Sequence, residues 1–119
     1  LELWAPLLHG GACVLYPERV PTAGVLGPFL QRHAVDTAWL TASLFHHLVD
    51  EDVRCLTGLR QLLVGGDVVS AEHVRRVYAA LPDIRLINGY GPTESTTFAS
   101  CHPIAHEDVA AGATSVPIG

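Results

Sequence analysis

The sequence predicts an α/β fold, a mostly parallel sheet flanked by helices. With 49% hydrophobic and 16% charged residues, the composition is that of a folded chain and not of a disordered one. Short apolar runs typical of buried strands alternate with helix-patterned stretches along the 119 residues. The connections between successive strand candidates are long enough to hold a helix, which is the crossover that parallel strands require. We therefore expect a parallel sheet with helices on both of its faces.

Helix candidates are marked by apolar residues that recur every three to four positions and by capping residues. Thr22, Ser43 and Ser70 each precede such a stretch and can cap it. Gly10-Gly11 ends the first helix, and a proline ends the last. Pro28 lies inside the second, which leaves open a later start of that helix, near Pro28. In chain order, the predicted helices cover residues 1–8, 22–33, 44–50 and 70–81.

Strand candidates are short apolar runs bounded by turn residues. The run Ala12–Tyr16 is one of them, because a proline stops it. The last two strands run into loops that contain glycine, Gly65-Gly66-Asp67 and Asn88–Glu94. Beyond Ser95 the pattern is strand-like at first, and we then expect a loop through His102-Pro103. The predicted strands cover residues 12–16, 37–40, 59–64 and 84–87.

The composition excludes several classes of function. A net charge of −5 without a basic cluster argues against nucleic-acid binding. No stretch is long and apolar enough to span a membrane, and we expect a cytoplasmic protein. Cys13, Cys55 and Cys101 are too widely spaced for a zinc site or a disulfide framework, so we expect reduced thiols. The seven histidines are interpreted as ordinary surface or core residues.

The sequence contains neither methionine nor lysine, and all seven of its basic residues are arginine. We therefore expect a segment of a longer protein. Arginine without lysine also suits a GC-rich bacterial genome.

The loop Asn88–Glu94 has the composition of a metal–nucleotide site. Ligands of parallel sheets bind at the carboxyl ends of the strands, where this loop and Gly65-Gly66-Asp67 both lie. Thr93 offers a hydroxyl, and the Glu94 carboxylate can hold magnesium together with substrate phosphates. Tyr90 offers an aromatic face for a base. No P-loop, dinucleotide fingerprint or nucleophile elbow is present. An ordinary Gly-Pro turn with a solvated Glu94 is the alternative.

The sequence Asn-Gly-Tyr-Gly-Pro-Thr-Glu at 88–94 resembles the core motif of adenylation domains of nonribosomal peptide synthetases. These domains belong to the adenylate-forming superfamily, which includes acyl-CoA ligases and luciferases. Further segments agree with the family in order and spacing, so the resemblance covers essentially the whole chain. These segments are residues 1–4, 39–43, 63–67 and 116–119.

The resemblance implies the central part of the large N-terminal subdomain of an adenylate-forming enzyme, with residues 1–119 forming a partial adenylation (AMP-binding) domain. In that family an amino-acid carboxylate attacks the α-phosphate of Mg-ATP, and the acyl group then passes to a phosphopantetheine thiol on a peptidyl carrier domain. A condensation domain of the same assembly line is a further expected partner. The upstream phosphate loop and the C-terminal subdomain with the catalytic lysine would lie outside the chain. We therefore expect the isolated segment to be inactive.

Individual roles follow from the same resemblance. Thr93 and Glu94 would be the catalytic pair, with Thr93 contacting phosphate and Glu94 holding Mg²⁺. Tyr90 would lie against the adenine of ATP, and Asn88 would read its amino edge. The implied nucleotide-binding set is Gly66, Asn88, Gly89, Tyr90, Gly91, Thr93 and Glu94.

The resemblance also implies an amino-acid pocket. Leu63 and Gly65 are two residues apart on a strand and share a face, as a pocket wall requires. Trp39 fills volume while glycines leave room, which favours a small branched aliphatic substrate, valine first and isoleucine or leucine next. Simple core positions for Trp39 and Leu63 are the alternative. The implied lining is Leu1, Trp39, Leu63, Gly65, Gly89, Thr97 and Phe98.

Two other functions remain open at this point. One is an acyl-CoA or aryl-acid ligase of the same superfamily. The other is a nucleotide-binding α/β module without catalytic activity.

Overall fold

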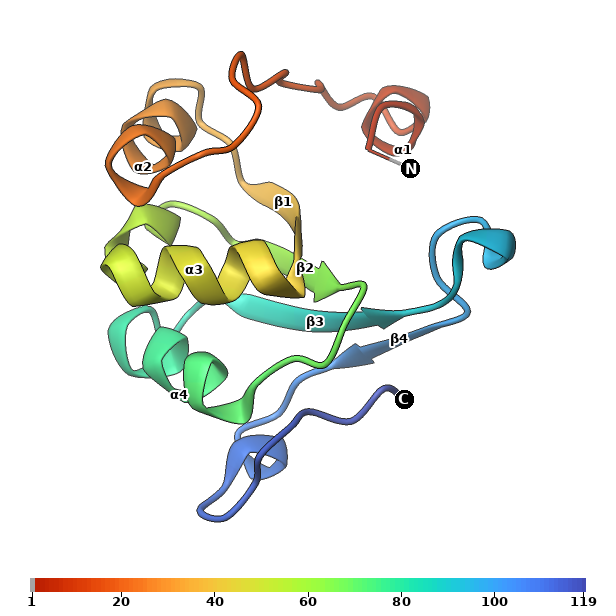
Figure 1. The fold of residues 1–119 in the computed structure, drawn as a ribbon. Helices are drawn as coiled ribbons and strands as arrows, with labels where there is room; N and C mark the ends of the chain where they lie inside the picture. The colour runs from red at the N-terminus through yellow and green to blue at the C-terminus, as the bar shows by residue number, and fades with distance from the viewer. Residues whose placement is uncertain (1) are drawn as a thin grey trace.

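The computed structural model describes residues 2–119, and its elements follow one another in a helix–strand alternation (Figure 1). The longer helices and the strands, in chain order, are α1 (Trp4–Leu8), α2 (Ala23–Arg32), β1 (Thr37–Thr41), α3 (Ala42–Asp52), β2 (Gln61–Gly65), α4 (Ala71–Ala80), β3 (Arg85–Tyr90) and β4 (Ser100–Pro103). Short 3-10 helices are η1 (Val53–Leu56), η2 (Thr93–Ser95) and η3 (Glu107–Val109).

Among the described residues the strands form one four-stranded sheet in the order β1-β2-β3-β4. The pairs β1–β2 and β2–β3 are parallel, and β4 is antiparallel to β3. Paired residues of neighbouring strands have their side chains on the same face of the sheet, and successive residues of one strand alternate between the two faces. The register therefore shows which side chains lie beside one another on each face. The prediction of a mostly parallel sheet flanked by helices is confirmed.

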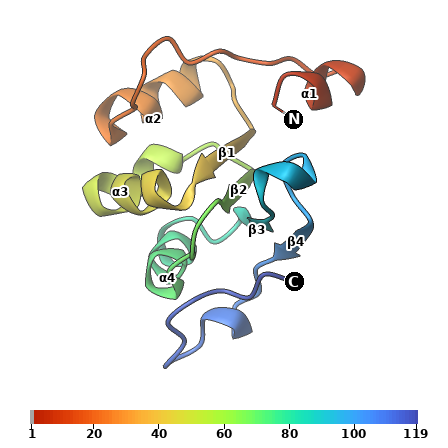
Figure 2. The same ribbon diagram turned by 45° about the vertical axis from the view of Figure 1, so that its right-hand side comes forward.

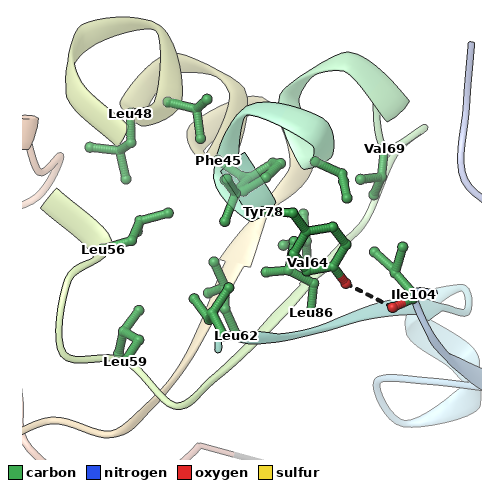
Figure 3. Packing of buried hydrophobic residues seen from close by; sticks show 14 of the residues in the cluster. Phe45, Leu48, Leu56, Leu59, Leu62, Val64, Val69, Tyr78, Leu86 and Ile104 are labelled. Atoms are coloured by element: carbon green, nitrogen blue, oxygen red, sulfur yellow. Dashed lines mark hydrogen bonds between the residues drawn. The ribbon is translucent and has the colours of Figure 1, made fainter. Parts of the chain in front are cut away.

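One face of the sheet is closed by α3 and α4, which lie on the same side of the strands in Figures 1 and 2. Leu62 and Leu86 point from adjacent strands into this core, where Phe45 of α3 is fully buried (Figure 3). Tyr78 of α4 donates a hydrogen bond from its hydroxyl to the Ile104 carbonyl, 2.7 Å away. The largest fully buried side chains of the described residues belong to this layer, and burial of apolar surface is the main stabilising contribution to a fold.

The other face is not covered by a helix within residues 2–119, so the expectation of helices on both faces is wrong for this part of the chain. Its row of side chains runs from Trp39 through Leu63 to Ile87. Trp39 and Leu63 are only half-buried. The ring of Phe98, from the loop before β4, lies near Trp39.

The four predicted helices are present, but their starts and caps need correction: the first helix begins at Trp4, and neither Thr22 nor Ser70 makes a side-chain capping bond. The second helix begins at Ala23 and keeps Pro28 inside, so the later start is wrong. Gly24, four residues before the proline, is exposed, and water can satisfy the carbonyl that Pro28 cannot bond. The third helix is capped by Thr41 and not by Ser43, because the Thr41 hydroxyl accepts from the Leu44 N–H at 3.3 Å.

The strand predictions hold for β1 and β2 and fail at the two ends of the chain. Ala12–Tyr16 is not a strand: no described strand pairs with it, and Leu15 is 73% exposed. β3 continues to Tyr90, three residues beyond its predicted end, because Gly89 and Tyr90 pair with β4. His102-Pro103 belongs to β4 and not to a loop, since antiparallel pairing with β3 supplies its backbone partners.

Candidate functional site

The carboxyl ends of β2 and β3 meet at one edge of the sheet. Gly65 is the register partner of Gly89, so the two glycine-containing loops that follow these strands begin side by side. Gly66 then turns the chain away with φ +84°, a conformation that glycine adopts without steric cost. The structure thus brings together the two loops that the sequence singled out.

Three glycines at this edge have no space for a side chain. A Cβ at Gly65 would overlap the backbone carbonyl of Gly89. One at Gly89 would lie 2.5 Å from the Phe98 ring, and one at Gly91 would lie 2.5 Å from the Ala99 nitrogen. The Ala99 N–H donates to the Tyr90 carbonyl at 2.8 Å, which folds the loop back over β3. These glycines are required by close packing of the loop on the strands.

Alternation along β3 divides the candidate residues between two faces. Gly89 lies on the open face, whereas Asn88 and Tyr90, one residue to either side, point to the opposite face. The end of the sheet therefore offers two separate surfaces, which share only the backbone of β2 and β3.

The open face gathers most of the predicted pocket. The Trp39 and Phe98 rings have centroids 6.4 Å apart, and the Phe98 ring lies over Gly89. Leu63 lies beside Trp39 in the same row, next to the pair formed by Gly65 and Gly89. Leu1, which was also predicted to line the pocket, lies outside the described residues.

The backbone of the two residues that precede Phe98 is strained. Thr96 and Thr97 both have positive φ, +56° and +96°, which is rare for β-branched residues. Strain of this kind persists only where surrounding contacts hold it in place. Here it accompanies the placement of the Phe98 ring against Gly89.

Trp39 has one feature that the sequence did not predict. Its indole Nε1 is buried and has no hydrogen-bond partner in the part of the chain that the structure describes. A buried donor of this kind costs free energy unless another group accepts from it. The row formed by Trp39, Leu63 and Ile87 is therefore apolar apart from this one donor.

The opposite surface holds Asn88 and Tyr90. Asn88 is only 3% exposed, and its Nδ2 donates to the Pro117 carbonyl at 2.9 Å. Tyr90 is 50% exposed at the end of the strand, so its ring is available to a planar ligand. Gly66 is exposed nearby in the loop after β2.

Thr93 and Glu94 lie in η2, just beyond Gly91, and both are exposed. The turn is held by backbone bonds, with the Thr96 N–H donating to the Thr93 carbonyl at 3.1 Å. The Glu94 carboxylate makes no hydrogen bond or ion pair with any residue of the range 2–119. No cluster of three metal-ligating side chains occurs in that range. One free carboxylate suits Mg²⁺, which keeps most of its ligands as water and substrate phosphate oxygens.

The loop after β2 is fixed by a contact that no sequence pattern indicated. The Ser70 N–H donates to His46 Nε2 at 3.1 Å, and the His46 ring lies 4.4 Å from the His73 ring, centroid to centroid. Burial and the neighbouring His73 lower the pKa of His46, which keeps its Nε2 free to accept. Asp50 faces the same cluster, with Oδ1 3.3 Å from His73 Nε2.

Comparison with known protein families identifies the family to which this chain belongs. Residues 1–119 match the family described as AMP-binding enzyme. The chain belongs to that family. No helix of this AMP-binding chain within residues 2–119 has both the length and the apolar character needed to cross a bilayer.

Curated relatives of the AMP-binding chain are peptide synthetases. A linear gramicidin synthase of Brevibacillus parabrevis is 51% identical over 99% of this chain, which is 2% of that protein. Surfactin synthase subunit 1 of Bacillus subtilis (strain 168) is 37% identical over 99% of this chain and 3% of its own length. The chain thus spans only a few per cent of the curated relatives that it matches.

Solved structures of adenylation domains resemble this chain in fold as well as in sequence. PA1221, described as an NRPS protein containing adenylation and PCP domains, superposes with a TM-score of 0.92 at 50% identity, over 99% of this chain and 23% of that one. The Klebsiella oxytoca NpsA N-terminal subdomain in complex with 3-hydroxybenzoyl-AMSN has a TM-score of 0.87 at 25% identity, over 99% of this chain and 30% of its own. The resemblance to synthetase adenylation domains and the N-terminal subdomain fold are both confirmed.

Proposed function

We propose that the full-length protein carrying this chain activates an amino acid as its aminoacyl-adenylate with Mg-ATP. The product acyl group then passes to a phosphopantetheine thiol of a carrier domain in nonribosomal peptide synthesis. The observation that carries the proposal is the divided end of the sheet, with polar and aromatic groups on one surface and the apolar side chains around Trp39 on the other. One reactant can bind on each surface and the two can meet at the shared strand ends.

The two surfaces have distinct roles in this reaction. Tyr90 and Asn88 hold the adenine, with Gly66, Gly89 and Gly91 keeping the backbone close to the nucleotide. Thr93 and Glu94 hold the phosphates and Mg²⁺, which when bound neutralises phosphate charge. The amino-acid carboxylate forms a bond to the α-phosphorus and pyrophosphate leaves. The protein accelerates this step by positioning and charge neutralisation, with no covalent bond to its own residues.

The apolar surface selects the amino acid. Trp39, Leu63 and Phe98 give this surface an apolar lining, which favours a small branched side chain, valine first; the Phe98 ring fills the space over Gly89, so the glycines add no room of their own. Pockets that discriminate by one methylene do so by about 1–3 kcal/mol, so isoleucine and leucine are expected as weaker substrates. Leu1 and Thr97 complete the proposed lining.

Other parts of the protein must supply what the chain lacks. We propose that residues 1–119 are part of an adenylation domain, and that the phosphate loop and the C-terminal subdomain with a catalytic lysine lie elsewhere in the protein. A peptidyl carrier domain is the proposed partner, supported by the adenylation–PCP architecture of PA1221. A condensation domain of the same cytoplasmic assembly is the second. The chain alone is expected to be inactive.

Amino-acid-dependent exchange of pyrophosphate into ATP, measured on the full-length protein across a panel of amino acids, tests the proposal. Valine is expected to give the highest rate. Glu94→Gln is expected to lower exchange roughly 100-fold, the scale of losing one preorganised charge-stabilising group, and to raise the Mg²⁺ concentration needed. Glu107→Gln, an exposed glutamate in η3, is the matched control and is expected to have no effect.

The aryl-acid ligase is a second candidate because the NpsA subdomain, 25% identical to this chain, was solved with a 3-hydroxybenzoyl ligand. Exchange with hydroxybenzoates but with no amino acid would favour it. Exchange with neither, from folded protein that binds ATP, would indicate a module without catalytic activity. If a charged or large aromatic amino acid gave the highest exchange rate, the proposed reaction would be supported and the proposed aliphatic pocket would be contradicted.

A further inference from the structure

The Asn88 amide is held in one orientation by a main-chain group. Its Nδ2 lies 2.9 Å from the Pro117 carbonyl oxygen, which can only accept a hydrogen bond. The flipped amide would place Oδ1 against that oxygen, with two acceptors facing each other and no proton between them. Asn88 is 3% exposed, so water cannot easily replace the lost bond. Oδ1, for which no hydrogen bond within residues 2–119 is found, is left as the group that Asn88 presents to a ligand.

The Pro117 carbonyl is itself fixed by the segment that contains it. We define the C-terminal segment as residues 114–118. At one end, the Ala71 N–H donates to the Thr114 carbonyl at 3.3 Å and the Val116 N–H to the Val69 carbonyl at 3.1 Å. At the other end, the Ser100 hydroxyl donates to the Ile118 carbonyl at 2.6 Å.

These bonds make the C-terminal segment a bridge across the site. One side of it is tied to the residues that follow the loop after β2, and the other to β4, the partner of β3. Ser100 and Asn88 lie on the same face, because Ser100 is the register partner of Tyr90 and Asn88 is two residues from Tyr90. The segment therefore crosses the surface to which Asn88 and Tyr90 point, and the Ile118 bond holds the peptide next to Pro117.

We infer that the Pro117 carbonyl determines the choice of purine by fixing the Asn88 amide with Oδ1 toward the base. This inference rests on the proposed function, in which Asn88 faces the nucleotide base. An oxygen acceptor pairs with the 6-amino group of adenine, which donates. It repels the 6-oxo group of hypoxanthine or guanine, which also accepts. An asparagine free to rotate could present Nδ2 to a 6-oxo purine, and the Pro117 carbonyl removes that option.

Pro117 and the Ser100 hydroxyl are thus positioning groups that act through Asn88. Sites built around a hydrogen bond reject a ligand with the wrong partner strongly, because a buried group is then left unpaired. Loosening the C-terminal segment should weaken that rejection. A purely structural role of the segment would change the use of all purine nucleotides equally.

The test compares ATP with ITP, whose base differs at position 6 by an oxo group in place of the amino group. Binding of both nucleotides is measured by calorimetry on the full-length protein, together with kcat/KM for amino-acid-dependent exchange. The wild type is expected to prefer ATP strongly. Ser100→Ala removes the bond to the Ile118 carbonyl and is expected to reduce the ATP:ITP ratio about three- to tenfold, the scale of one hydrogen bond. Pro117→Gly frees the backbone at the carbonyl itself and is expected to reduce the ratio in the same direction.

Ser115→Ala is the matched control, since Ser115 is an exposed serine of the same segment and its hydroxyl makes no hydrogen bond with the described residues. It should leave the ratio unchanged. An unchanged ratio in both Ser100→Ala and Pro117→Gly, with melting temperature and overall activity lowered, would overturn the inference. So would a wild type that binds ATP and ITP equally. Failure of the proposed function is a different result, the absence of exchange with every amino acid, and the binding ratio can still be measured in that case.

Discussion

The two faces of β2 differ in what they do for the molecule, although their side chains alternate along one strand. Leu62 and Val64 are fully buried at 0% exposure beneath α3 and α4. Leu63, between them, is half-buried on the face that no helix within residues 2–119 covers. Under the proposed function, stability and substrate recognition therefore fall to alternate residues of β2, and this division can be tested one residue at a time.

The largest effect is expected on the closed face. Leu62→Ala leaves a cavity between β2, α3 and α4 and is expected to cost about 2–5 kcal/mol in the free energy of unfolding. Denaturant unfolding of the full-length protein, followed by a probe in this domain, measures it. Val25→Ala, an apolar residue 46% exposed on α2, is the control and should cost well under half as much. Equal losses would show that the closed face is not the stabilising one.

Gly65→Ala tests the backbone that the two faces share. The added Cβ would overlap the Gly89 carbonyl, so one strand end must shift. We expect a loss of about 1–3 kcal/mol in the free energy of unfolding, the usual cost of overpacking, together with loss of amino-acid-dependent exchange. Gly24→Ala is the matched control, because it adds the same methyl group at an exposed site where no atom lies within 4 Å and φ is not positive. Retained exchange in Gly65→Ala would mean that the strand ends do not form the site.

Leu63→Ala is expected to have a smaller effect on stability and a specific effect on substrate choice. A half-buried leucine contributes about 1 kcal/mol to the free energy of unfolding. The widened pocket should shift exchange from valine toward leucine and isoleucine by roughly tenfold in relative kcat/KM. An unchanged preference, with a stability loss equal to that of Leu62→Ala, would place Leu63 in the core and contradict the division of the strand.

The smallest effect concerns the pH dependence of the loop after β2. The pKa of His46 is lowered from its ordinary 6.5, first by burial and then by His73, while Asp50 and Asp67 oppose the shift. Because the folded pKa is below the unfolded one, stability is complete above pH 6.5 and is lost as pH falls through the folded pKa. His46→Gln keeps an acceptor for the Ser70 N–H but does not titrate. Its melting temperature should fall less than that of the wild type between pH 7.5 and 5, whereas His33→Gln, an exposed control, should follow the wild type.

The sequence predicted the closed face better than the edges of the sheet. Apolar runs and their spacing identified β1, β2 and α4, because these elements bury their own residues against one another. Ala12–Tyr16 has the same apolar pattern, yet no described strand pairs with it, and pairing partners are not visible in a local pattern. β4 was predicted only in part, as a strand-like pattern beyond Ser95, because antiparallel pairing with β3 extends the strand through His102-Pro103, where the local preference is weak.

The geometry of the candidate site could be predicted only in part. The sequence indicated that Leu63 and Gly65 share a face, and the register confirms it. No pattern indicated that Asn88 bonds to the Pro117 carbonyl, because every residue carries a main-chain carbonyl and its type does not mark which one will be used. The unpartnered Trp39 Nε1 was equally invisible, since only three-dimensional packing shows which donors are buried.

The C-terminal segment contributes only main-chain atoms to the bonds that hold it. Thr114, Pro117 and Ile118 accept through their carbonyls, and Val116 donates through its N–H. Such contacts do not depend on side-chain identity within the segment. A substitution that changes a side chain there but keeps the path of the backbone therefore leaves the bridge across the site in place.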